Sequence, residues 1–200
     1  PRRPASLTKI MTLYLLFEAL DTNRFKLTSQ LSVSARAAGQ EPTKLGLRAG
    51  DTITVREIIL GLVTKSANDA AVVAAEALGG TEDRFAQIMT ERARRLGMTG
   101  TTFRNASGLP DPRQVTTARD FAILARAVIK TYPHHYHFFS TRDFTYHGIT
   151  HANHNRLNNW YAGADGLKTG YIRASGFNLV TSAQRGDRRL IGVVMGGISP

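Results

Sequence analysis

The chain has 200 residues, of which 42% are hydrophobic and 20% are charged, so one well-buried core is expected and a disordered chain is excluded. It contains no cysteine, which excludes disulfides, thiolate nucleophiles and cysteine metal sites. The formal net charge of +11 admits polyanionic partners, but the basic residues are dispersed and form no nucleic-acid-binding pattern, so no nucleic-acid partner is expected.

Helical spacing of apolar residues predicts five helices, which begin near Ser6, Thr54, Asp69, Thr81 and Thr117. Residues 54–57 have the form of a capping box, and Asp69 is expected to cap the third helix with its side chain. Gly79-Gly80 should end that helix. The segments 26–47 and 103–114 are polar and contain Gly and Pro, so we expect them to be irregular, with short extended pieces in the first.

After Pro133 the pattern changes from helices to strands. Residues 144–150 predict a short β-hairpin, and residues 176–197 predict two longer strands joined by a turn at 185–188. Helices that precede a group of antiparallel strands are typical of an α+β fold, in which the helices pack on the sheet. No apolar run approaches the roughly 20 residues of a membrane span.

The first motif with chemical potential is Ser6-Leu7-Thr8-Lys9, at the start of the first expected helix. Residues three apart share a helix face, so the Lys9 amine can reach the Ser6 hydroxyl. Serine needs a neighbouring base to act as a nucleophile. A lysine supplies one when burial or a second cation keeps it unprotonated. Taken alone, this spacing is common by chance and is equally typical of a surface helix.

Two further motifs follow. Ser66-Ala67-Asn68 lies between two expected helices, where its hydroxyl and carboxamide can both point into a cleft, although helix caps favour the same residue types. In Lys168-Thr169-Gly170, the lysine would supply a cation and the threonine a donor for a substrate carboxylate. Gly170 would let a peptide approach the strand closely. Alone, each is an ordinary junction or turn, and only their order along the chain indicates an active site.

Ser-x-x-Lys, a Ser-x-Asn-like element and Lys-Thr-Gly are together the signature of β-lactamases and penicillin-binding proteins. Residues 4–12, 66–71, 117–120 and 165–170 resemble the D-alanyl-D-alanine carboxypeptidases of the low-molecular-mass penicillin-binding group, and the resemblance covers essentially the whole chain. It implies one catalytic domain over residues 1–200. The implied fold is α+β and β-lactamase/transpeptidase-like, with the active site at the junction of an antiparallel sheet and a helical cluster.

The resemblance also implies residue roles. Ser6 would be the acylated nucleophile and Lys9 its base. The remaining implied site residues are Ser66 and Asn68 in the second element, Lys168, Thr169 and Gly170 in the third, and the backbone N–H groups of Ser6 and Tyr171 as the oxyanion hole. Two such donors lower the barrier by several kcal/mol.

The implied reaction removes the terminal D-Ala of peptidoglycan stem peptides through an acyl-enzyme, without a cofactor, and penicillin would bind covalently to the same serine. This substrate implies a location outside the cytoplasm, in the periplasm or on the outer face of the cytoplasmic membrane. Family members have strands before the first motif and a closing helix after the last, so we expect this chain to lack both. A membrane anchor could lie outside the sequence shown.

Two positions depart from the family pattern. Tyr171 stands where members often carry His. Many members place Arg in the stretch that is Asn153-His154-Asn155-Arg156 here, so the basic role could fall to His154 or to Arg156, and the sequence leaves that choice open.

Other functions compete with this interpretation. A D,D-endopeptidase would use the same centre on cross-linked peptidoglycan. A class A β-lactamase needs a glutamate to activate the deacylating water, and no glutamate follows Glu91, so penicillin should stay bound. An inactive binding module or a basic nucleic-acid binder belongs to a different class. The six histidines lack the paired-helix spacing of a zinc site, so no metal is expected.

Overall fold

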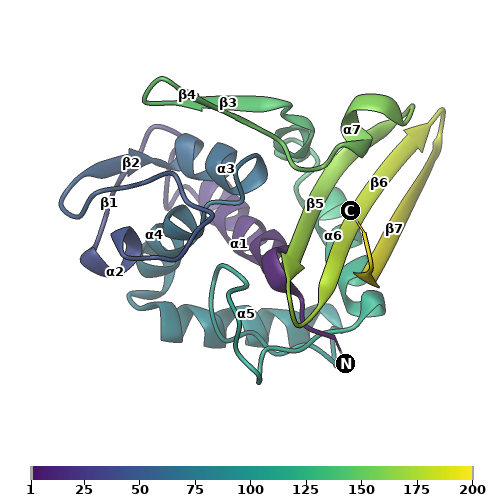
Figure 1. The fold of residues 1–200 in the computed structure, drawn as a ribbon, viewed down its shortest axis with the longest axis horizontal. Coiled ribbons are helices and arrows are strands. Elements are labelled where there is room, and N and C mark those ends of the chain that lie inside the picture. The colour runs from purple at the N-terminus through teal and green to yellow at the C-terminus, as the bar shows by residue number, and fades with distance from the viewer. Residues whose placement is uncertain (1, 200) are drawn as a thin grey trace.

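In the computed structural model, which describes residues 2–199, a cluster of helices packs beside a three-stranded antiparallel sheet (Figure 1). The helical elements are η1 (Ala5–Thr8), α1 (Lys9–Asp21), α2 (Ala35–Ala38), α3 (Val55–Val63), α4 (Asn68–Gly79), α5 (Glu82–Leu96), α6 (Ala118–Thr131), η2 (Tyr136–Ser140) and α7 (Leu157–Trp160). The strands are β1 (Gln30–Ser32), β2 (Thr52–Thr54), β3 (Asp143–Tyr146), β4 (Ile149–Ala152), β5 (Ala164–Ile172), β6 (Gly176–Arg185) and β7 (Arg188–Gly197).

Helices α1 and α4 form the centre of the helical cluster. Ten of the thirteen residues of α1 are buried, and so are the first eight residues of α4. A helix that is apolar on nearly all sides belongs in a core, and the amphipathic helices α3, α5 and α6 each bury one face against the same core. None of the described helices is long and apolar enough to cross a lipid bilayer.

The main sheet has the strand order β5-β6-β7, and all its pairs are antiparallel. Strand β5 pairs only with β6 among the described residues, and η1 packs against it. Two short pairs, β1 with β2 and β3 with β4, complete the described sheets. The start of α1 therefore meets an edge strand of the sheet at the boundary between the two layers (Figure 1).

The α+β prediction is confirmed, and most of the predicted helix signals act as expected. Thr54 and Glu57 form both bonds of a capping box at α3. Thr81 and Thr117 each accept a backbone N–H at the start of their helices, α5 and α6. The hairpin turn at 185–188 joins β6 to β7.

Two expectations about the helices are wrong. The segment 26–47 contains the one-turn helix α2, whose N-cap Ser34 accepts the backbone N–H of Ala37. Asp69 is not the N-cap of α4, because that position is held by Ala67, which makes no side-chain cap bond. The carboxylate of Asp69 accepts the backbone N–H of Ala70 in the first turn, and it also accepts the backbone N–H groups of residues 45–47 in the preceding loop.

Candidate active site

Three parts of the chain that are distant in sequence bring the predicted polar residues together. Ser6 lies in η1, Lys9 is the first residue of α1, Asn68 is the first residue of α4, and Lys168 lies in the middle of β5. The 3₁₀ turn of η1 leads directly into α1, so the one-turn spacing of Ser6 and Lys9 is kept. The side chains of Ser6, Lys9 and Asn68 contact one another where the helical cluster meets the sheet.

Lys9 is the centre of this cluster. Its side chain is fully buried, and its Nζ lies 3.2 Å from Ser6 Oγ, 2.7 Å from Asn68 Oδ1 and 2.6 Å from the Ser107 carbonyl oxygen. Asn68 is itself held, because its Nδ2 donates to the Glu41 carbonyl at 2.9 Å. The amine therefore occupies one position, set by three contacts.

The chemistry of these three contacts matches a neutral amine. A neutral lysine has two N–H donors and one lone pair, whereas the ammonium form has three donors and no acceptor. Two of the neighbours, the Asn68 amide oxygen and the Ser107 carbonyl, only accept hydrogen bonds. The third is the Ser6 hydroxyl, which can donate. Once both N–H groups are used, the remaining lone pair is directed at the Ser6 proton.

Electrostatics favours the same protonation state. Burial, assisted by the charge of Lys168, holds the pKa of Lys9 well below its usual value, and the opposing effect of Asp69 is smaller. Burial also lowers the pKa of Lys168 to about 7. Both follow from the cost of placing an ammonium in a poorly solvated site. A lysine without its proton at neutral pH can act as a general base.

Ser66 lies beside this cluster in an uncommon conformation. Its φ of 59° is in the left-handed region, and its buried Oγ has no hydrogen-bond partner among the described residues. The backbone is held there by Thr43, whose hydroxyl donates to the Ser66 carbonyl at 2.9 Å. A buried hydroxyl without a partner is costly in a finished core, and it indicates a group kept free for a ligand.

Strand β5 supplies the third motif. The Lys168 side chain is buried, and its Nζ donates to the Thr169 carbonyl at 3.0 Å. A Cβ atom on Gly170 would lie 2.9 Å from Ser6 N, so this residue is glycine because η1 packs directly on the strand. Sequence reasoning assigned the close approach to a substrate. Tyr171 follows with an exposed ring that packs on Phe177.

The segment between β4 and α7 carries the two alternative basic residues, and the structure distinguishes them. His154 is an exposed residue, yet partial burial of its ring lowers its pKa to about 4, and the charges of Lys168, Lys65 and Lys9 add to the effect. An imidazole with this pKa is neutral near pH 7, so His154 is not a cation there. Arg156 is exposed on the surface, and a guanidinium is the more suitable permanent cation of the two residue types.

Sequence reasoning missed three contributors to the site. Lys65 is a further cation, close enough to act on His154. Ser107 provides a carbonyl for Lys9 from the irregular loop 103–114. Gly108 lets this loop approach η1, because a Cβ at its position would overlap the Ala5 carbonyl. Backbone acceptors and long-range approaches leave no local motif. The presence of Gly108 in a Gly/Pro-rich loop was the one available signal.

Asp69 holds the loop that lies next to Asn68 in the site. It is fully buried, and its carboxylate accepts the backbone N–H groups of residues 45–47 at 3.0, 2.9 and 3.0 Å. The same loop receives the Asn68 side chain at Glu41, and the Asn68 backbone N–H at Thr43. Hydrogen bonds to a carboxylate are stronger than neutral ones. Asp69 therefore positions the loop against which Asn68 is oriented.

Comparison with known proteins identifies the family. The family model described as D-alanyl-D-alanine carboxypeptidase, Peptidase S11, matches residues 1–199. The chain is 40% identical to the D-alanyl-D-alanine carboxypeptidase DacC of Escherichia coli over 201 residues, which cover 96% of this chain and 50% of the relative. The chain spans about half the length of the first curated relatives it matches.

Solved structures agree. Penicillin binding protein 6B from Escherichia coli is similar, with a TM-score of 0.92 and 38% identity, over 99% of this chain and 65% of that one. Penicillin-Binding Protein D2 from Listeria monocytogenes, in an ampicillin-bound form, has a TM-score of 0.82 and 33% identity over 98% of this chain and 80% of that one. The expected β-lactamase/transpeptidase-like fold is confirmed by these likenesses.

Proposed function

Because the chain belongs to the D-alanyl-D-alanine carboxypeptidase family, peptidase S11, we propose that it is a serine-type D-Ala-D-Ala carboxypeptidase with Ser6 as nucleophile. The substrate would be the stem peptide of peptidoglycan, from which the terminal D-Ala is removed. The observation that carries the proposal is the buried Lys9 amine, which lies 3.2 Å from Ser6 Oγ between two obligate acceptors.

Acylation follows from this geometry. Ser6 Oγ attacks the carbonyl carbon before the terminal D-Ala, and its proton passes to the Lys9 lone pair. The oxyanion that forms is stabilised by the backbone N–H groups of Ser6 and Tyr171, which are worth several kcal/mol together. Collapse of the intermediate breaks the C–N bond, and the departing amine takes a proton from Lys9, with the Ser66 hydroxyl as relay. This leaves an ester on Ser6 and free D-Ala.

Deacylation repeats these steps with water. The water attacks the ester carbon, gives its proton to Lys9, and the Ser6 oxygen leaves and is reprotonated. Asn68 keeps Lys9 in place through both halves, since its amide oxygen accepts from Nζ at 2.7 Å. Lys9 accepts and returns a proton in both acylation and deacylation, so no second base is required.

The edge of β5 is the proposed site for the peptide. This strand has one paired side among the described residues, so an extended substrate can add to the other as a guest strand. Thr169 would donate to the terminal carboxylate of the substrate. The cation for that carboxylate would come from Lys168 when protonated, with Arg156 rather than His154 as the nearby permanent charge. The net charge of +11 aids encounter with acidic peptides.

The remaining proposals concern the whole protein. The chain would act as one catalytic domain over residues 1–200, in a protein located outside the cytoplasmic membrane, where its substrate occurs. Any membrane anchor would lie outside these residues. Covalent binding of β-lactam antibiotics is proposed on the same nucleophile, as supported by the ampicillin-bound form of the Listeria protein.

Two other activities use a similar centre. A D,D-endopeptidase would cleave cross-linked peptides at the same serine, and a digest of purified peptidoglycan separates it by yielding cleaved dimers instead of free D-Ala. A β-lactamase needs a second base for water. Asp111, the acid of the nearby loop, is engaged with Arg113, and the hydrogen bonds from that arginine lower its pKa to about 2, which makes it a poor base.

Labelling with a fluorescent penicillin tests the proposal in a single gel. The unmodified protein should form a covalent adduct that persists for many minutes, and Ser6→Ala should form none. Ser32→Ala, an exposed serine of β1, is the matched control and should label normally. Labelling of Ser6→Ala would overturn the nucleophile assignment, and rapid loss of label from the unmodified protein would favour a β-lactamase.

A further inference from the structure

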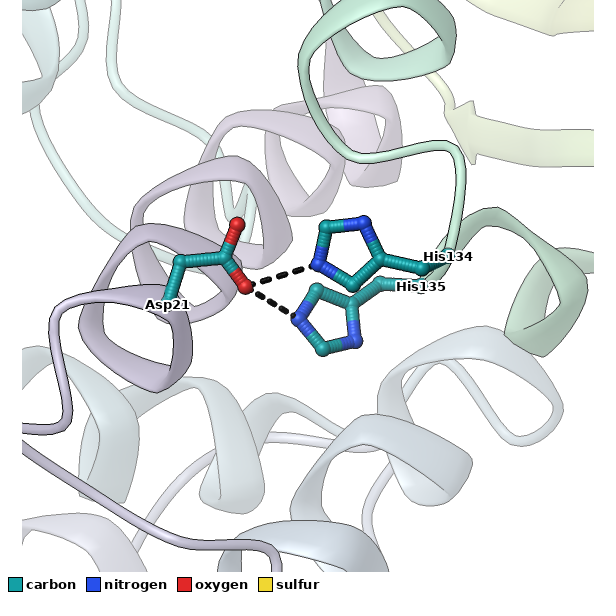
Figure 2. A group of neighbouring side chains, drawn as sticks. All are labelled: Asp21, His134 and His135. Atoms are coloured by element: carbon teal, nitrogen blue, oxygen red, sulfur yellow. Dashed lines mark hydrogen bonds and ion pairs between the residues drawn. The ribbon is translucent and has the colours of Figure 1, made fainter.

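A second polar cluster lies at the far end of α1, away from the proposed active site. Asp21, the last residue of that helix, accepts contacts from two adjacent histidines, His134 and His135 (Figure 2). Both Nε2 atoms lie 2.8 Å from the same oxygen, Asp21 Oδ1. The three potential ligand atoms lie within 4.8 Å of one another. The proposed reaction uses none of these side chains.

The end of α1 favours a cation. Its last turn contains two acids, Glu18 and Asp21, and no basic residue, although the carbonyl end of a helix carries partial negative charge. Glu18 is paired with Arg92 at 2.8 Å. Among the described residues, Asp21 is paired with the two imidazoles, which are charged only when protonated. Neutral imidazoles leave the carboxylate without a cationic partner in this cluster.

The geometry suits a metal ion. Imidazole nitrogen and carboxylate oxygen bind Zn²⁺ at about 2.0–2.2 Å, so two ligands of one tetrahedral ion lie about 3.4 Å apart. The separation between each nitrogen and Oδ1 is 2.8 Å. Each pair of ligand atoms would have to move apart by about 0.6 Å to admit the ion.

One of the imidazoles is already held in position. The His135 side chain is 14% exposed, and its ring stacks on Phe17 of α1 with centroids 5.0 Å apart. His134 is 55% exposed and Asp21 is 34% exposed, so the remaining coordination positions face solvent and water can fill them. The main entropic cost of binding the ion would then be the ordering of one side chain, that of His134.

We propose that Asp21, His134 and His135 form a surface site for a divalent transition-metal ion of the zinc type. Neutral imidazoles would each give the Nε2 lone pair, and Asp21 one carboxylate oxygen. The ion would link the end of α1 to the turn after α6. That turn leads into η2, where the Tyr136 hydroxyl donates a hydrogen bond to Asp165 at the start of β5. The role would be structural, because the site is at the opposite end of α1 from Ser6.

Titration of the full chain with Zn²⁺ at pH 7.5, against a chromophoric chelator, tests this site. We expect one equivalent to bind with micromolar affinity or better. His134→Asn and His135→Asn should each weaken it tenfold or more. The matched control is His147→Asn at the β3–β4 turn, where the φ of 45° suits asparagine, and it should bind as the unmodified chain does.

Thermal unfolding gives an independent readout. Zn²⁺ at 100 times its dissociation constant should raise Tm by about 5–10 °C in the unmodified chain and in His147→Asn. That shift should be lost in His134→Asn, whose metal-free Tm should stay within about 2 °C of the unmodified chain because the side chain is exposed. Absence of Zn²⁺ binding, equal binding by His134→Asn, or equal loss in His147→Asn would each overturn the proposal.

Discussion

Each end of α1 carries side-chain charge of the same sign as the partial charge of the helix at that end. The two ends differ in how this unfavourable charge is accommodated. Lys9 stands at the amino end, where partial positive charge opposes a cation, and Glu18 and Asp21 stand at the carboxyl end, where partial negative charge opposes anions. The amino end is fully buried, so Lys9 is driven to lose its proton. The carboxyl end is partly exposed to solvent, and its acids pair with Arg92 and with two imidazoles.

This contrast shows how burial decides what an unfavourable charge becomes. In the buried case, no water is available to stabilise the ammonium, and the result is a base beside a hydroxyl. In the solvated case, a carboxylate is easily kept ionised, and the result is a set of ion pairs or a metal site. Helix α1 therefore has a proposed catalytic residue at its amino end and a proposed structural site at its carboxyl end.

The largest effect is expected from Lys9→Met, which removes the base and leaves an apolar chain of similar length. The rate of acylation by penicillin should fall about 10³-fold, because general base catalysis is worth 10²–10⁴-fold. The measurement is the rate of label incorporation, with circular dichroism to show that the fold persists. Lys26→Met, at an exposed position, is the control. A drop of less than tenfold would mean that Lys9 is not the base.

The next largest effect is expected from Asp69→Asn, which should destabilise the protein near the amino end of α1. Loss of the charge from four backbone hydrogen bonds should cost about 2–3 kcal/mol of unfolding free energy. Because Asp69 raises the pKa of Lys9, the acid limb of the acylation rate should also move to lower pH. Asp187→Asn at the β6–β7 turn is the control. Lower stability with an unmoved pH profile would restrict Asp69 to holding the loop.

Lys168→Met should stabilise the protein while weakening its acylation. A buried lysine with a pKa of about 7 binds fewer protons when folded than when unfolded. Stability from this residue therefore rises with pH between about 7 and about 10.4, and is reduced below that window. We expect Lys168→Met to gain about 2 kcal/mol in denaturant unfolding at pH 7 and to show a weaker rise from pH 7 to pH 9. A less stable variant with an unchanged pH slope would contradict this.

The smallest effect is expected at the solvated end. Arg92 pairs with Glu18 at 2.8 Å and lies over the Tyr14 ring, 5.6 Å from its centroid. Arg92→Met should cost about 1 kcal/mol, since partly exposed ion pairs contribute little. Most of that cost should disappear in a double variant with Glu18→Gln. A cost above about 3 kcal/mol would show that this end is as tightly coupled as the buried one.

Contacts between residues close together in the sequence could be predicted, whereas contacts between distant residues could not. Ser6 and Lys9 are one turn apart, and the capping box at Thr54 spans four residues, so both can be recognised locally. The bond from Lys9 to the Ser107 carbonyl spans 98 residues and uses a backbone group, which no side-chain pattern encodes. Asp21 and His134 are 113 residues apart, so their contact was likewise hidden.

Asp69 illustrates the same limit at close range. Its position at a helix start is typical of a cap, and sequence reasoning assigned that role. The structure shows a stronger alternative, because three loop N–H groups converge on the carboxylate from 22 to 24 residues away. Where several backbone donors compete for one acid, the tertiary arrangement decides.

The protonation state of Lys9 tests the central claim most directly. The chain has six lysines, so ¹⁵Nζ and ¹³Cε signals of labelled protein can be assigned by single substitutions and followed against pH. A Lys9 signal at the position of a neutral amine at pH 7.5, with a midpoint well below 10.5, is the predicted result. An ammonium signal that persists beyond pH 9 would contradict the account, because Ser6 would then have no base.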